Sequence, residues 1–97
     1  YMQQPLIEMV VEAHQKGGKI VFYRLVSFAA LFYGQQPIEM LHTYKFPGNP
    51  DILNRPHKQD IFVMADKSNK DRLLQEHPLV KHLEDRGTFS LFILEKK

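Results

Sequence analysis

The segment Gly17-Gly18-Lys19 is the first group of residues in this sequence whose type and spacing suggest chemistry. A phosphate-binding loop uses such residues, because its backbone N–H groups and its lysine contact phosphate oxygens. That loop has the spacing GxxxxGK followed by serine or threonine, and it connects a strand to a helix. Here a helical pattern precedes the glycines, and Ile20 stands where serine or threonine is required. We therefore interpret the glycines as the end of a helix.

Five histidines raise the question of a metal site. His77 and His82 are five positions apart with Pro78 between them, whereas two ligands on one helix face need a spacing of four. No cysteine and no HExxH motif accompanies them. We therefore expect surface histidines and assign no metal ligand and no cofactor. The other three histidines lie in unrelated segments: His14, His42 and His57.

The acidic residues and Ser27 show no catalytic pattern. Asp60 and Asp66 flank a strand-like run, where carboxylates usually end a strand or cap a turn. Ser27 lacks the GxSxG motif of a serine nucleophile and is interpreted as a helix cap. The run Glu84-Asp85-Arg86 is interpreted as a solvated charged turn. The sequence thus predicts no catalytic, cofactor-binding or metal-binding residue.

Aromatic residues are concentrated in one part of the chain and invite comparison with RNA-binding sheets. Such sheets carry their rings within a Lys/Arg-Gly-Phe/Tyr pattern, which is absent here. The net charge of +2 is also too weak to favour a phosphate backbone. We expect no nucleic-acid partner and predict that Tyr23, Phe32 and Tyr33 pack in or beside the core. The whole aromatic group comprises Phe22, Tyr23, Phe28, Phe32 and Tyr33.

The composition indicates one soluble globular domain over residues 1–97. Hydrophobic residues make up 43% of the chain and charged residues 25%, as in ordinary folded proteins. The absence of cysteine excludes disulfides and thiolate catalysis. No apolar run reaches the roughly 20 residues that span a bilayer, so we expect no transmembrane segment in this sequence. Because the first residue is Tyr1 and not methionine, we expect either residues left from a tag at this end or a piece cut from a longer protein.

Hydrophobic spacing predicts helices that alternate with strands. Helical spacing covers residues 5–16 and, across Pro78, residues 69–86, with Leu79, Val80 and Leu83 facing inward and Gly87 ending the helix. This order favours an α/β fold with a small, mostly parallel sheet of about four strands, covered by helices in Rossmann-like layers. The remaining predicted elements are a short helix at 28–33, strands at 19–24, 38–42, 60–66 and 88–94, and a loop at 45–59 with one helical turn.

Three short segments resemble a known family. A strand ending in Tyr23-Arg24 is followed by the segment SFAALFY at residues 27–33, and Pro37 then opens the next strand. This pattern resembles the soluble C-terminal domain of membrane-embedded glycosyltransferases of the protein mannosyltransferase and aminoarabinose transferase type, glycosyltransferase family 39. The likeness covers about residues 17–97. Two features depart from the family: Gln35-Gln36 stand where it often has arginine, and the loop at 47–58 is longer than usual.

The resemblance implies a non-catalytic domain of an integral-membrane enzyme that transfers a sugar from a polyprenyl-phosphate carrier to lipid or protein. Its partner would be the membrane-embedded catalytic part of the same protein, and it would face the periplasm or cell exterior of a bacterium. The family's catalytic carboxylates lie elsewhere in the full protein and match no position here. We therefore expect the isolated domain to bind and transform nothing. The alternative is a free-standing α/β module that binds a protein or a small ligand.

Overall fold

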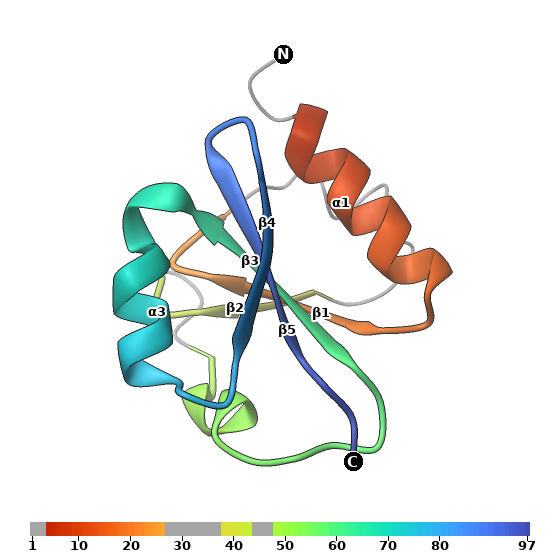
Figure 1. The fold of residues 1–97 in the computed structure, drawn as a ribbon, viewed down its shortest axis with the longest axis vertical. Coiled ribbons are helices and arrows are strands. Elements are labelled where there is room, and N and C mark those ends of the chain that lie inside the picture. The colour runs from red at the N-terminus through yellow and green to blue at the C-terminus, as the bar shows by residue number, and fades with distance from the viewer. Residues whose placement is uncertain (1–3, 27–37, 44–47) are drawn as a thin grey trace.

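The computed structural model describes residues 4–26, 38–43 and 48–97. Figure 1 shows these residues as one twisted sheet with α1 on one side and α3 on the other. The predicted helix at 28–33, with Phe28, Phe32 and Tyr33, lies outside the described residues. The elements are α1 (Gln4–Gln15), β1 (Lys19–Tyr23), β2 (Ile38–Leu41), η1 (Pro50–Leu53), β3 (Ile61–Asp66), η2 (Lys67–Asn69), α3 (Lys70–Glu76), β4 (Lys81–Arg86) and β5 (Phe89–Leu94).

The sheet of the described residues has five strands in the order β2-β1-β3-β5-β4. Strand β1 pairs in parallel with β2 and with β3, whereas β5 pairs antiparallel with β3 and with β4. The antiparallel pairs extend over more residues than the parallel ones. The predicted α/β class is confirmed. The prediction of a mostly parallel sheet of about four strands is wrong, because the sheet is mixed and has a fifth strand.

The fifth strand, β4, replaces the second half of the helix predicted at 69–86. Helix α3 ends before Pro78, whose ring has no N–H to donate and collides with the preceding helical turn. After it, residues 81–86 alternate between exposed and half-buried positions, which is the period of a strand. A two-residue turn at Gly87-Thr88 then leads into β5, and Gly87 has the positive φ of 57° that tight hairpin turns favour.

The three apolar side chains that the predicted helix would have turned inward therefore differ in burial. Leu79 and Leu83 are 47% and 48% exposed, and only Val80 of the three is buried. Gly87 turns a hairpin and does not end a helix. The run Glu84-Asp85-Arg86 lies on β4 and is not the predicted charged turn.

Two hydrophobic clusters fill the two faces of the sheet. Along β1, Ile20 and Phe22 face α1, whereas Val21 and Tyr23 face α3 and η1. The apolar residues of β5 are also divided between the two clusters. This confirms the prediction that both faces of the strand are partly apolar. Tyr23 is fully buried, as predicted. The cluster under α1 consists of Leu6, Met9, Val10, Ala13, Ile20, Phe22, Met40, Phe62, Met64, Phe89 and Leu91.

The remaining boundaries agree closely with the sequence pattern. Helix α1 ends at the predicted glycines, where Gly17 has a φ of 75° and the N–H of Gly18 donates to the carbonyl of Ala13. The predicted helical turn inside the long loop is η1. No helix in the described part of the chain is long and apolar enough to cross a bilayer.

Candidate functional site

A cluster of polar side chains lies at the carboxyl ends of the parallel strands β1 and β2. Tyr23 ends β1, and His42 directly follows β2. Glu76 and His77 reach them from the end of α3. The carboxyl ends of parallel strands are the usual place for ligands in α/β proteins, because loops diverge there. We call this group the His42–His77 cluster; it comprises Tyr23, Arg24, His42, Asn54, Glu76 and His77.

A hydrogen bond between Tyr23 and Glu76 connects the sheet to α3. The buried Tyr23 hydroxyl donates to Oε1 of Glu76. Burial and this carboxylate raise the pKa of Tyr23, and the same hydrogen bond lowers the pKa of Glu76. Oε2 of Glu76 lies 3.9 Å from Nη2 of Arg24 and 4.0 Å from Nε of Arg72. Both distances exceed hydrogen-bond length, so the guanidinium groups act on Oε2 through charge alone.

His77 is held in one tautomer. Its Nδ1 lies 2.7 Å from Oδ1 of Asn54, and an amide oxygen can only accept, so Nδ1 donates the proton. Burial lowers the pKa of His77, which favours the neutral ring. In that ring Nε2 carries a free lone pair. Nε2 is buried without a hydrogen-bond partner among the residues that the structure describes, although His77 is only 3% exposed.

The fold brings His42, Glu76 and His77 together. A ring nitrogen of each histidine and a carboxylate oxygen of Glu76 all lie within 4.8 Å of one another. The ring centroids of the two histidines are 6.3 Å apart, and both rings contact Tyr23 at near-perpendicular angles. Two imidazoles and one carboxylate form a donor set that zinc uses in proteins.

Two residues of the cluster have a left-handed backbone. Arg24 has a φ of 54° and His42 a φ of 60°, a conformation that is uncommon outside glycine and that histidine, asparagine and aspartate adopt more often than other residues. The two positions are neighbours across the parallel pair, because the N–H of Arg24 donates to the carbonyl of Leu41. The Arg24 guanidinium lies 5.5 Å from the centre of the Tyr23 ring, and its Nε is buried without a partner in the described structure.

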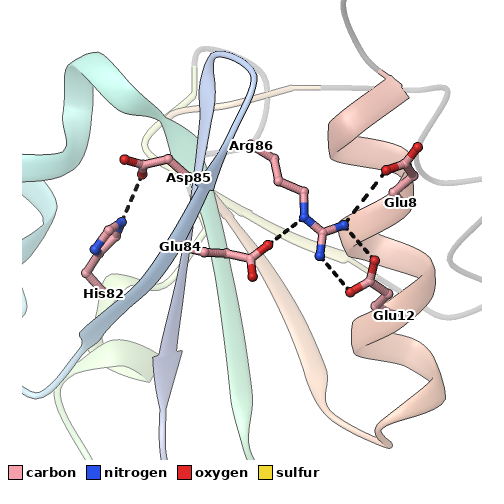
Figure 2. A network of polar contacts seen from close by, with 6 residues as sticks. All are labelled: Glu8, Glu12, His82, Glu84, Asp85 and Arg86. Carbon is pink, nitrogen blue, oxygen red and sulfur yellow. Dashed lines mark hydrogen bonds and ion pairs between the residues drawn. The ribbon is translucent and has the colours of Figure 1, made fainter.

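A second polar network joins α1 to β4 (Figure 2). Arg86 binds both carboxylate oxygens of Glu12, at 2.6 and 2.8 Å, and its Nε donates to Glu84. Glu8 lies further away, at 3.9 Å. These contacts raise the pKa of Arg86 and lower that of Glu12. Arg86 is the shared partner of all three carboxylates, so the network holds α1 against β4.

His82, Asp85 and Ser90 have the residue types of a catalytic triad but a different arrangement. His82 Nε2 lies 2.9 Å from Oδ1 of Asp85, and the Ser90 hydroxyl donates to the same oxygen. In a triad the histidine takes the proton of the serine directly. Here the serine contacts the aspartate instead, and the hydroxyl belongs to a fully buried residue. The arrangement therefore fixes the hairpin of β4 and β5.

Comparison with known proteins gives no relative that would explain either cluster. No family model matches the chain. No curated protein and no solved structure matches it either. The function is therefore inferred from the residues and their geometry.

Asp60 and Asp66 have the structural roles expected of them from the sequence. Asp60 accepts a hydrogen bond from the N–H of Lys96 at one end of β3. Asp66 caps η2 by accepting from the N–H of Ser68. Ser27 lies outside the described residues.

The histidines depart from the sequence-based expectation. His77 is buried, so the prediction of surface histidines is wrong for this residue. His14 lies on α1, on the opposite face of the sheet from α3, and His82 pairs with Asp85. No local spacing connects His42 with His77, because they meet only through the packing of α3 on the sheet. The chemical signal available in the sequence was the pair Glu76-His77 itself, two adjacent potential ligands next to Pro78.

Proposed function

We propose that this chain is the non-catalytic extracytoplasmic domain of an integral-membrane glycosyltransferase, which transfers a sugar from a polyprenyl-phosphate carrier to lipid or protein. The observation that carries the proposal is the pair Tyr23-Arg24 at the end of β1, the centre of the resemblance to glycosyltransferase family 39. Tyr23 is buried and bonded to Glu76, and the N–H of Arg24 bonds to β2. The pair therefore joins β1 to β2 and α3, which suits a motif with a structural role.

The distribution of carboxylates supports a non-catalytic role. Transfer from a lipid-linked sugar requires a carboxylate positioned as a base near the sugar phosphate. Glu12 and Glu84 face Arg86, while Asp85 faces His82 and Ser90. A domain of this size also has little room for a groove that holds a polyprenyl chain. Its role would be to cover the membrane-embedded catalytic part or to position the acceptor on the outer face of the membrane.

A second candidate function is a free-standing module that binds a small ligand. Two buried polar atoms favour it, Nε of Arg24 and Nε2 of His77, both without a partner in the described part of the chain. Buried polar atoms are normally hydrogen-bonded, and an exception at the carboxyl ends of parallel strands suits a ligand position.

The coding sequence upstream of Tyr1 distinguishes the two functions. The transferase proposal expects about ten or more apolar segments of roughly 20 residues there, with the chain carried in the membrane fraction of cells. A start codon near Met2 would contradict it and favour the free-standing module. Catalysis is tested separately by incubating the purified chain with a polyprenyl-phosphate sugar and candidate acceptors. We expect no sugar release, and turnover by the chain alone would show that it is catalytic.

A further inference from the structure

We propose that His42, Glu76 and His77 bind a divalent transition-metal ion, with zinc as the best match. The site lies between α3 and the ends of β1 and β2. It goes beyond the glycosyltransferase proposal and does not depend on it. It also departs from the expectation that the isolated domain binds nothing, because that expectation treated the two histidines as unrelated.

The donor atoms select the class of metal. Two imidazole nitrogens and one carboxylate oxygen suit zinc, nickel and copper, whereas magnesium and calcium prefer oxygen ligands alone. A ligand histidine binds the ion through an unprotonated ring nitrogen, and the contact of Nδ1 with Asn54 leaves Nε2 as that nitrogen. Three protein ligands leave the fourth position of a tetrahedral ion open to water.

His77 is prepared for such a role by Asn54. Metal-binding histidines usually donate their second ring N–H to a neighbouring acceptor, which fixes the tautomer and the orientation of the ring. Asn54 is that acceptor, at 2.7 Å from Nδ1. Nε2 is left buried and without a partner in the described residues. An unsatisfied buried polar atom is costly, and a metal ion at Nε2 removes that cost.

A neighbouring side chain also orients Glu76. The Tyr23 hydroxyl donates to Oε1, so Oε2 is the oxygen that carries no hydrogen bond from Tyr23. The two arginines near Oε2 oppose a cation by charge, and they do so from 3.9 and 4.0 Å. The side chain of Arg72 is 56% exposed and can turn into solvent when the ion binds. Removing the charge of Arg72 should therefore strengthen metal binding.

A bound zinc ion limits how far apart its three donor atoms can lie. Zinc–nitrogen bonds of about 2.0–2.1 Å place the ligand atoms of a tetrahedral ion roughly 3.4 Å apart. The three donor atoms all lie within 4.8 Å of one another, so no pair has to approach by more than about 1.4 Å. His42 is half-buried at the end of an edge strand, and rotation of its side chain supplies this movement.

The test titrates the 97-residue chain with zinc chloride by calorimetry and with cobalt chloride by visible absorption. We expect saturable binding of one ion per chain, a tetrahedral cobalt spectrum and a rise in melting temperature that a chelator reverses. His42→Asn keeps a residue that tolerates the left-handed backbone, and Glu76→Gln keeps an acceptor for Tyr23. Each should weaken zinc binding at least about tenfold. Arg72→Gln should strengthen it about three- to tenfold, and more at low salt.

His14→Asn is the matched control, because His14 also has a buried ring nitrogen without a partner among the described residues but lies on α1. Its zinc affinity should equal that of the wild type. Unchanged affinity in both His42→Asn and Glu76→Gln, or no saturable binding, would overturn the proposal. If either variant fails to fold, the imidazole resonances of the wild-type chain decide. Zinc must shift those of His42 and His77 and leave those of His14 and His82 in place, and any other pattern contradicts the site.

Discussion

Arg86 binds Glu12 through two hydrogen bonds, 2.6 Å from Nη1 to Oε2 and 2.8 Å from Nη2 to Oε1, across 74 positions of sequence. This paired geometry is specific to the planar guanidinium group. It fastens the first helix of the described structure to the edge strand β4, which pairs with one strand, β5, in the sheet of the described residues.

Arg86→Lys should lower the free energy of unfolding by about 1 kcal/mol, because a lysine cannot form both hydrogen bonds with one carboxylate. Urea denaturation followed by circular dichroism measures the change. Glu95→Gln is the control, since its pair with Lys81 is exposed on both sides and should matter little. Equal effects of the two substitutions would show that Arg86 contributes no more than an ordinary surface charge.

The same pair predicts a dependence on pH. The hydrogen bond from Arg86 lowers the pKa of Glu12 below its ordinary 4.5 in the folded chain. Glu12 therefore stabilises the fold above about pH 4.5, and this contribution is lost as the pH falls through the lowered pKa. The difference in melting temperature between wild type and Glu12→Gln should be largest near neutral pH and shrink on acidification. A difference that stays constant down to acidic pH would exclude the ionised pair as its cause.

Gly48 is predicted to resist substitution more strongly than Gly17. Both have positive φ, 64° and 75°, so alanine at either position costs about 1–2 kcal/mol of backbone strain. A Cβ atom on Gly48 would also lie 2.5 Å from the carbonyl oxygen of Met40 and from the side chain of Leu41, whereas nothing lies within 4 Å at Gly17. Gly48→Ala should therefore cost about 1–3 kcal/mol more than Gly17→Ala. Equal unfolding midpoints for the two variants would contradict this packing.

The Tyr23 hydroxyl is predicted to stabilise the fold through Glu76. Tyr23→Phe leaves the buried ring in place and removes the donor to Oε1, so we expect a loss of about 1–3 kcal/mol in the free energy of unfolding. A double-mutant cycle with Glu76→Ala isolates the contact. Strictly additive effects would mean that the two side chains do not interact in solution.

Val80, just before β4, and Leu83, on β4, are buried to very different extents. Val80 is 3% exposed and Leu83 48% exposed, although the helical pattern predicted both to face inward. Val80→Ala should cost about 1–3 kcal/mol, while Leu83→Thr should be nearly neutral, since threonine suits an exposed strand position. Comparable losses in the two variants would favour a continuous helix at 69–86 over the hairpin.

The strands of this fold were predictable where apolar residues occur in unbroken runs. Residues 61–64 and 20–23 are such runs, and both became buried strands. Strand β4 was missed because its residues are mainly charged, and because Leu79, Val80 and Leu83 have the spacing of a helix face. Its existence depends on pairing with β5, which is a long-range contact that local spacing does not encode. The missing strand also explains why the sheet was expected to be mostly parallel.

The His42–His77 cluster was not predictable for a related reason. The spacing rules for metal ligands apply to residues on one helix or one loop. His42 follows a strand, whereas His77 follows a helix, and Asn54 comes from the end of η1. Burial of His77 and its contact with Asn54 arise only when these three elements pack together. The adjacent pair Glu76-His77 is therefore the one signal in the sequence, and nothing in it points to His42 as the third ligand.

Strand β3 lies at the centre of the sheet and pairs with β1 on one side and with β5 on the other. During synthesis the ribosome releases β1, β2 and β3 before the final hairpin, so one edge of β3 stays open until β5 emerges. Helix α1 gains its ion pair only after β3 has emerged, because Arg86 follows β3 in the chain. A product terminated before residue 81 would expose an unpaired apolar strand edge, which is a site for aggregation and proteolysis. The hairpin of β4 and β5 therefore completes both the pairing of the central strand and the attachment of α1.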